Sequence, residues 1–259
     1  MIEQLILGMA QGLAEWLPIS SEAVLILLQT KLFGAVALTQ MIQTALFLHL
    51  GTFLAALVYF RREIFNLLKI KSWSLEEKKL APFLLITTVI SGLLGFLLLI
   101  FLGQWEEQLL SGGRWLTLLV GMLLVGTALF QFKAKESGNR QTKDLSVFDG
   151  IFLGLTQALA TLPGFSRSGL TVSALLSRKF DKAVALKLSF LMSLPIVLVG
   201  NILLNFNQFF LTPQRIFGTL VSFLTGLLTI HLFLQIAKKI NFAYFVFGFG
   251  LLTIISALV

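Results

Sequence analysis

The chain has 259 residues, of which 57% are hydrophobic and 12% are charged, and its mean hydropathy is +0.92. A soluble domain has about a quarter of its residues charged, so this composition excludes an ordinary soluble protein. The sequence contains no cysteine, which excludes disulfides and thiolate chemistry. The net charge of +8 comes mostly from residues in short loops, so the positive-inside rule explains it better than nucleic-acid binding does.

The chain begins with a segment that we predict to form a re-entrant helical hairpin. Residues 2–33 are apolar but are interrupted by Pro18, which ends one helix, and by Ser20 and Ser21, which can cap the next. Each arm has about a dozen residues and a helical length of about 20 Å, too short for a hydrocarbon core of about 30 Å. A polar tip at membrane depth is tolerated only where it is buried in protein or lines a wet cavity.

Three apolar spans follow the first hairpin, then come a second hairpin and three more spans. The second hairpin covers residues 148–179 and is interrupted at Pro163 and Gly164. The basic loops 61–80 and 133–147 both fall on the cytoplasmic side if neither hairpin crosses the membrane. The first hairpin then enters from outside and the second from the cytoplasm. The predicted spans cover residues 39–60, 81–102, 115–132, 184–206, 216–236 and 241–258.

The two hairpins resemble each other in sequence. Residues 8–21 (GMAQGLAEWLPISS) align with residues 154–168 (GLTQALATLPGFSRS), and their prolines match after a shift of one residue. Because an odd number of spans follows each hairpin, the second copy is inverted relative to the first. We therefore predict a single all-α membrane domain over residues 1–259, built from inverted repeats at about 1–132 and 148–259.

The hairpin tips have the character of an oxyanion receptor. The second arm of each hairpin starts at its tip, so free N–H groups and a partial positive charge lie there. Arg167 adds a planar guanidinium that matches phosphate oxygens. The alternative is that Arg167 only pairs with Glu15 or Glu22 and holds the hairpins together. The other candidate phosphate ligands are hydroxyl groups and flexible glycines, namely Ser20, Ser21, Gly164, Ser166, Ser168 and Gly169.

Two acidic residues flank the tip of the first hairpin. Glu15 and Glu22 would repel a phosphate unless they were protonated, paired with Arg167 or bridged by a divalent cation. Because carboxylate oxygens suit Mg²⁺ or Ca²⁺, we predict that both glutamates hold one of these ions. The alternative for Glu22 is a simple interaction with the helix dipole. Gln11 lies one turn before Glu15 and shares its helix face.

The chain has two histidines, His49 and His231, and a hydrogen-bonded packing role is the default for each. His49 lies in the middle of its predicted span, deep enough to reach the hairpin tips. A role as proton carrier is therefore an alternative for His49.

Two stretches carry a resemblance to a known family. QGLAEWLPISS (residues 11–21) and LATLPGFSRSGLTVSALL (residues 159–176) resemble the undecaprenyl-diphosphate phosphatase family of the bacitracin-resistance type, and the resemblance extends over essentially the whole chain. It implies a multi-pass enzyme of the plasma membrane that removes the terminal phosphate of a polyprenyl diphosphate outside the cytoplasm. This reaction recycles the lipid carrier for cell-wall glycans. The implied partners are the lipid and the membrane, without nucleic acid, and a homodimer is a further option.

The resemblance also implies roles for individual residues. Gln11 and Glu15 match the family's (E/Q)xxxE motif, and Ser21 matches a serine proposed as the nucleophile, with Ser20 beside it. Arg167 matches the arginine that grips phosphate. Around it the resemblance places Ser166, Ser168 and Thr171. The expected catalytic set is Ser21, Glu15, Arg167 and Glu22.

One position departs from the family pattern. The family continues after its two serines with a histidine three residues on, and this chain has Val24 there. Valine neither takes nor gives a proton, so the substitute would be Glu22, Glu15 or His49. Alternatively, a metal ion and Arg167 activate water or serine without a histidine. The rival class of function is a transporter that moves polyprenyl phosphate without hydrolysing it. A catalytically dead paralogue is a third and less economical reading.

Overall fold

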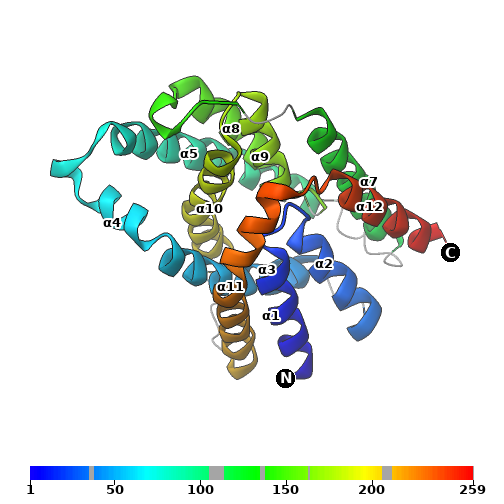
Figure 1. Ribbon diagram of the computed structural model, residues 1–259. Coiled ribbons are helices and arrows are strands. Elements are labelled where there is room, and N and C mark those ends of the chain that lie inside the picture. Colours follow the sequence, from blue (N-terminus) through cyan, green and yellow to red (C-terminus); the bar gives the residue numbers. More distant parts are fainter. Residues whose placement is uncertain (35–37, 105–113, 135–137, 163, 206–211, 259) are drawn as a thin grey trace.

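The computed structural model describes residues 1–34, 38–104, 114–134, 138–162, 164–205 and 212–258, and no strand occurs within these ranges (Figure 1). This confirms the predicted all-α class. The helices are α1 (Ile2–Ala14), α2 (Ser21–Leu28), α3 (Leu38–Tyr59), α4 (Arg61–Leu68), α5 (Leu75–Gly103), α7 (Arg114–Lys133), α8 (Val147–Leu159), α9 (Arg167–Ser177), α10 (Lys182–Asn205), α11 (Pro213–Lys239) and α12 (Ala243–Leu258).

A helix lies at each of the predicted spans, but the helices differ in their capacity to cross a bilayer. Four of the described helices, α5, α7, α10 and α11, are long and apolar enough to do so. A fifth candidate combines α3 with α4, which are bent by 76° relative to each other. Helix α12 has 16 residues, fewer than the roughly 20 that a straight crossing requires. The described part of the chain is thus a multi-pass membrane protein with four or five candidate spans.

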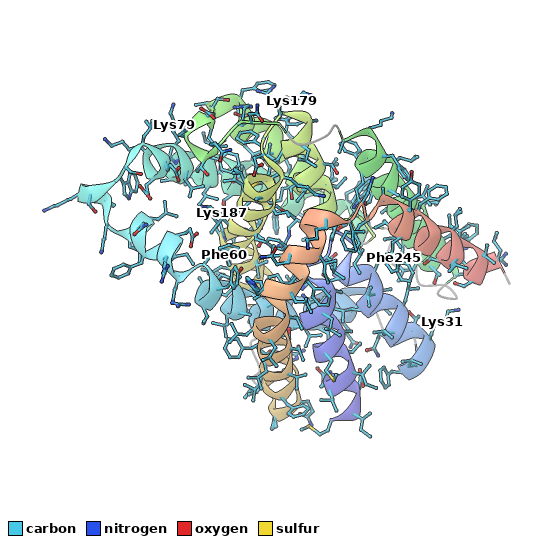
Figure 2. All side chains as sticks on the ribbon, in the orientation of Figure 1. Lys31, Phe60, Lys79, Lys179, Lys187 and Phe245 are labelled. Carbon is cyan, nitrogen blue, oxygen red and sulfur yellow. The ribbon has the colours of Figure 1, made fainter. Side chains whose placement is uncertain are left out.

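Residues 61–80 are not the plain loop that the sequence suggested. They contain α4 and the first turn of α5, which begins at Leu75 rather than near residue 81. Helix capping by Ser74 favours the early start, because the Ser74 backbone N–H donates to Glu77 Oε2 over 2.8 Å and Ser74 Oγ accepts from the Glu76 N–H over 3.2 Å. Lys79 of this segment and Lys179 after α9 lie toward the same upper edge of the molecule in Figure 2.

Both predicted hairpin breaks are present, and serines cap the second arms as expected. Helix α1 ends at Ala14, and the Ser20 hydroxyl accepts from the Ala23 N–H over 3.2 Å at the start of α2. At the start of α9 the Ser166 hydroxyl accepts from the Gly169 N–H over 3.1 Å. Gly164 has a φ of +114°, a backbone conformation that favours glycine. Pro163 lies outside the described residues.

The helices pack closely because small residues line their contacts. Helix α1 packs on α11, and α11 also packs on α3. At the first contact Gly12 faces the backbone of Gly226, and the Trp16 indole N–H donates to the Gly226 carbonyl over 3.0 Å. Small residues that let helix backbones approach are typical of helix contacts in membranes. The tip of the first hairpin is thereby fixed against the second half of the chain.

A buried carboxylate fixes the start of the second hairpin. Asp149 has no exposed surface, and it accepts hydrogen bonds from Arg140 (2.6 Å), Arg178 (2.8 Å) and the Ser146 hydroxyl (2.6 Å). Burial alone would raise the pKa of Asp149, but these hydrogen bonds outweigh burial and lower the pKa to about 2. Asp149 is therefore ionised at neutral pH and ties the connecting segment to both arms of the hairpin.

We expect Gly12→Ala to destabilise the protein. The added Cβ would lie 2.7 Å from the backbone nitrogen of Gly226, so α1 and α11 would have to separate. Overpacking of this kind costs about 1–3 kcal/mol. The measurement is the thermal unfolding midpoint in detergent. Gly248→Ala is the matched control, because nothing lies within 4 Å of a Cβ added there. Equal midpoints for the two variants would contradict the close packing.

Candidate functional site

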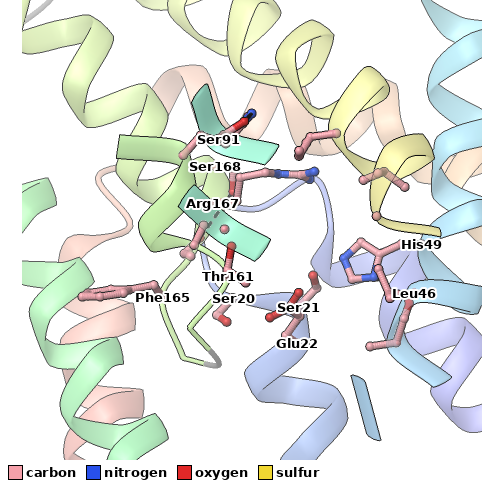
Figure 3. A pocket seen from close by; sticks show the side chains of 18 of the residues that line it. Ser20, Ser21, Glu22, Leu46, His49, Ser91, Thr161, Phe165, Arg167 and Ser168 are labelled. Carbon is pink, nitrogen blue, oxygen red and sulfur yellow. Dashed lines mark hydrogen bonds between the residues drawn. The ribbon is translucent and has the colours of Figure 1, made fainter. Parts of the chain in front are cut away.

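The two hairpin tips meet at a cavity of about 170 Å³, which has room for several water molecules. Figure 3 shows Ser21, Glu22, His49 and Arg167 around this space. The polar end of the cavity is formed by the first tip and the second tip together. The lining residues at this end are Glu15, Ser20, Ser21, Glu22, Ser166, Arg167 and Ser168. The structure thus brings most of the predicted site residues to one place.

The remaining walls of the cavity are mostly apolar. They are formed mainly by α3, α5 and α10, with Leu46, Phe96, Leu99, Ile196, Val197 and Val199 among the lining side chains. Polar side chains also line them, namely Ser91 on α5, Gln157 on α8 and Thr161. A cavity with one charged end and apolar walls suits a ligand that has an anionic head and a hydrocarbon tail.

Glu15 is the centre of the polar end. Its Oε2 accepts from the Ser21 hydroxyl over 2.8 Å and from Gln11 Nε2 over 2.9 Å. The same oxygen lies 3.2 Å from His49 Nε2, and Oε1 accepts from Arg167 Nη2. The Glu15 residue is only 6% exposed, so these partners replace water around the carboxylate. Residues from both hairpins and from α3 therefore converge on one carboxylate.

Arg167 both pairs with Glu15 and keeps donors for a ligand. It is the first residue of α9, and its side chain is 16% exposed and lines the cavity. Its Nε is buried and has no hydrogen-bond partner among the described residues. A guanidinium has five N–H donors, so pairing through Nη2 leaves several of them available. The two roles considered for Arg167, pairing and phosphate binding, are therefore compatible in one geometry.

The serines have different roles. Ser20 and Ser166 cap helices, whereas the Ser168 hydroxyl donates to the Leu17 carbonyl over 3.0 Å and joins the two tips. Ser21 directs its hydroxyl to Glu15 at the cavity surface. Ser21 is consequently the hydroxyl best placed for proton transfer to a carboxylate.

Some predicted ligands lie behind the cavity wall. Gln11 supports Glu15, and the Thr171 hydroxyl bonds to the Arg167 carbonyl (2.8 Å) and to Ser189 Oγ (2.7 Å). Gly164 and Gly169 pack against α7. None of these four lines the cavity in the described part of the chain, so their direct contact with a ligand stays a prediction.

The carboxylates fit a divalent cation only in part. Glu22 lines the cavity and makes no hydrogen bond or ion pair to a described residue, so it is available as a ligand, whereas Glu15 is met by several donors. No group of three or more His, Cys, Asp or Glu side chains suited to a metal occurs in the described ranges. These donors fit an Mg²⁺ ion that takes most of its ligands from phosphate oxygens and water, not a cage made by the protein alone.

Val24 does not face the site. It packs against an apolar cluster that includes Ala14, Ile19 and Val120. Of the three substitutes for the family's histidine, Glu15 alone forms a described hydrogen bond with Ser21, and His49 contacts Glu15 rather than Ser21.

Helix α7 supports both tips, which the sequence did not indicate. Gln131 Nε2 donates to the Pro18 carbonyl over 2.7 Å and packs over Gly169, and Thr127 Oγ1 accepts from the Ser166 N–H over 3.1 Å. The available signal was the presence of polar residues inside an apolar span, since such residues usually face the interior of the bundle.

Fold and site together define a helical membrane protein with an arginine–carboxylate–serine site buried where two hairpins meet. A family model described as "Bacitracin resistance protein BacA" matches residues 4–255. The chain belongs to this family.

Several archaeal proteins that are similar to this chain share the name "Undecaprenyl-diphosphatase". The chain is similar to a protein named "Undecaprenyl-diphosphatase" from Methanococcoides burtonii, with 41% identity over 98% of this chain and 97% of the relative. Proteins with the same name from Haloarcula marismortui (34% identity, 98% and 96% covered) and Methanothrix thermoacetophila (32%, 98% and 95%) are similar as well.

We expect Gln131→Leu to weaken both stability and any activity of the site. The Pro18 carbonyl would lose its donor in a partly buried place, at a cost of about 1 kcal/mol, and the tips would be less firmly held. Thermal unfolding in detergent measures the first effect. Phe130→Leu is the control, because Phe130 is the next residue on α7 and its side chain is exposed (47%) rather than packed against the tips. If the two variants unfold at the same temperature, Gln131 does not clamp the tips.

Proposed function

We propose that the protein is an undecaprenyl-diphosphate phosphatase of the plasma membrane. It cleaves the phosphoanhydride of a polyprenyl diphosphate, releases phosphate and returns the monophosphate carrier to glycan synthesis. Membership of the family and the names of the relatives support this activity. The observation that carries it is the contact of Glu15 with both Ser21 and Arg167 at the polar end of a cavity with apolar walls.

In the proposed reaction Ser21 is the nucleophile. Its Oγ attacks the terminal phosphorus while its proton passes to Glu15, which accepts the Ser21 hydrogen bond over 2.8 Å. The bond from the terminal phosphorus to the bridging oxygen breaks, and the prenyl monophosphate leaves with the electron pair. Water then attacks the phosphoserine and the bond from the phosphorus to Ser21 Oγ breaks. Glu15 returns its proton to Ser21 Oγ, and the proton of the water passes to the carboxylate that this frees and on to solvent, so that phosphate is released and both residues are restored. An alternative for Ser21 is to orient a water that attacks directly.

The second tip holds the phosphate. The guanidinium of Arg167 lines the cavity together with Ser166 and Ser168 at the start of α9, and both a guanidinium and a helix N-terminus favour an anion. Charge that develops on the phosphate oxygens is stabilised most strongly in a site from which water is excluded. The hydrocarbon tail lies along the apolar walls of α3, α5 and α10.

We propose that a divalent cation, Mg²⁺ or Ca²⁺, binds with the diphosphate. Glu22 and Glu15 would hold it, Glu22 being the carboxylate without a partner among the described residues. When bound, such an ion neutralises charge on the phosphate oxygens and orients the diphosphate.

We further propose six spans and two re-entrant hairpins arranged as inverted repeats, with the basic loops in the cytoplasm. Helix packing supports this arrangement. Helix α1 packs on α11 as α8 packs on α5, and α3 packs on α11 as α10 packs on α5. In the proposed repeat α1 is equivalent to α8, α3 to α10, α5 to α11 and α7 to α12, so each contact in one half has its counterpart in the other. The contacts of α7 with α12 and of α3 with α10 each join two equivalent helices.

We expect Arg167→Ala and Ser21→Ala to lose turnover. Purified protein should release phosphate from undecaprenyl diphosphate, and each variant should be slower by at least about 100-fold, because one loses the charge on the phosphate and the other the attacking hydroxyl. His231→Leu, which changes an exposed residue on α11, is the control. Near-normal release by both variants would refute the assignment. Movement of intact lipid phosphate across proteoliposomes, with no release, would instead establish a transporter.

Metal removal is expected to slow phosphate release reversibly. With EDTA the rate should fall by at least about tenfold, because the diphosphate charge is then unscreened, and Mg²⁺ or Ca²⁺ should restore it. Glu22→Gln should raise the ion concentration that gives half-maximal rate. A rate that is the same with EDTA and with Mg²⁺ would remove the cation from the proposal.

A further inference from the structure

His49 occupies a place in the site that the proposed reaction does not use. It is 7% exposed, it lies on α3 rather than on a hairpin, and it lines the cavity (Figure 3). Its Nε2 lies 3.2 Å from Glu15 Oε2, the same oxygen that accepts the Ser21 hydroxyl. His49 is therefore next to the oxygen that takes the proton in the proposed reaction.

The other ring nitrogen fixes the orientation of the imidazole. His49 Nδ1 lies 2.6 Å from the carbonyl of Ala45, one turn earlier on α3. A carbonyl oxygen only accepts, so Nδ1 is the donor in this contact. Nε2 then donates to the Glu15 carboxylate only when the ring carries both protons, so the contact described here is that of an imidazolium with a carboxylate. With Nδ1 held, the ring plane is set and Nε2 points at Glu15. Because both ring nitrogens make contacts, the imidazole has one fixed orientation and can hold the Glu15 carboxylate in place.

Hydrogen bonds from neighbouring helices hold the backbone of α3 in place around His49. Consecutive backbone carbonyls around His49 each accept a hydrogen bond from a side chain. The pairs are Leu46 with Asn201 (3.1 Å), Phe47 with Thr219 (3.1 Å), Leu48 with Ser222 (2.8 Å) and His49 with Thr52 (3.1 Å). Asn201 belongs to α10, and Thr219 and Ser222 belong to α11. Bonds of this kind between helices hold α3 in register with both neighbours.

Glu15 is held by contacts at both carboxylate oxygens, and a ligand affects only one of these oxygens directly. It follows the last residue of α1 and has donors on both oxygens, Arg167 at Oε1 and Ser21 and Gln11 at Oε2. A phosphate bound at the remaining N–H groups of Arg167 shares the guanidinium charge with Glu15 and so weakens the contact at Oε1. The contacts at Oε2 must then keep the carboxylate facing Ser21.

We propose that His49 is a positioning residue that holds Glu15 Oε2 toward the Ser21 hydroxyl while the phosphate occupies Arg167. The proposal rests on the proposed phosphatase activity. His49 acts through the hydrogen bond from Nε2 to Glu15, so a side chain with a donor at the same place should replace it, and an apolar side chain of similar size should not.

The first test compares His49→Gln with His49→Leu in phosphate release. We expect His49→Leu to lower kcat by about 10- to 100-fold with KM changed by less than about threefold, because a misplaced carboxylate affects the reaction more than ground-state binding. His49→Gln should retain kcat within about fivefold. His231→Leu serves as the matched loss of a histidine, because His231 on α11 contacts Tyr59, away from the cavity.

Three outcomes would overturn the proposal. Wild-type kcat in His49→Leu would show that the contact is not needed. Equal losses in His49→Gln and His49→Leu would show that the hydrogen bond to Glu15 is not what matters. A rise in KM with kcat unchanged would place His49 in substrate binding instead.

A second test does not depend on activity. The chain has two histidines, so a spectrum of protein labelled with ¹⁵N in the histidine rings contains two ring systems, and Tyr59→Phe assigns that of His231. We expect Glu15→Gln to shift the His49 ring signals and to leave those of His231 in place. Unchanged His49 signals would overturn the proposal. If the wild type released no phosphate, the proposed function would fail, and this spectrum would still decide whether His49 binds Glu15.

Discussion

The ion pair between Glu15 and Arg167 is the contact on which the site depends. The two side chains are 5% and 16% exposed, and charges at such depth cost several kcal/mol each unless they are paired. The pair fixes the ends of two hairpins against each other, and the Ser168 contact with Leu17 reinforces it. Ser21 and His49 then take their places around the same carboxylate. Removing either charge would leave the other buried without the opposite charge that pairs with it here.

The same pair explains how a site can be both stable and ready for a ligand. Arg167 uses Nη2 for Glu15, and its buried Nε has no partner among the described residues. A buried ion pair contributes little net stability compared with apolar packing, so stability alone is a poor reason for it. A guanidinium held at a cavity with donors to spare is better explained as a receptor for an oxyanion.

The features that could be predicted from the sequence are local ones. Pro18 and the serine caps at Ser20 and Ser166 act within a few residues, and both hairpin breaks lie where these residues predicted them. The Arg167 and Glu15 pairing could be foreseen because isolated charges are rare in membranes. The contacts of Gln131 and His49 depend on how helices from distant parts of the chain pack, and no local pattern encodes that packing. The early start of α5 is different, because the residues that cap it, Ser74 and Glu77, are close together in the sequence and form a local pattern.

The separation of the two charged partners has a consequence for biosynthesis. Glu15 and Arg167 are 152 residues apart, so the nascent chain exposes the glutamate long before the arginine has been made. Until then the first hairpin has a carboxylate with no cation to meet it, and full burial in lipid is unfavourable. The contact between the two hairpins can therefore form only after the second has been synthesised, so the docking of one half of the chain onto the other comes late in assembly.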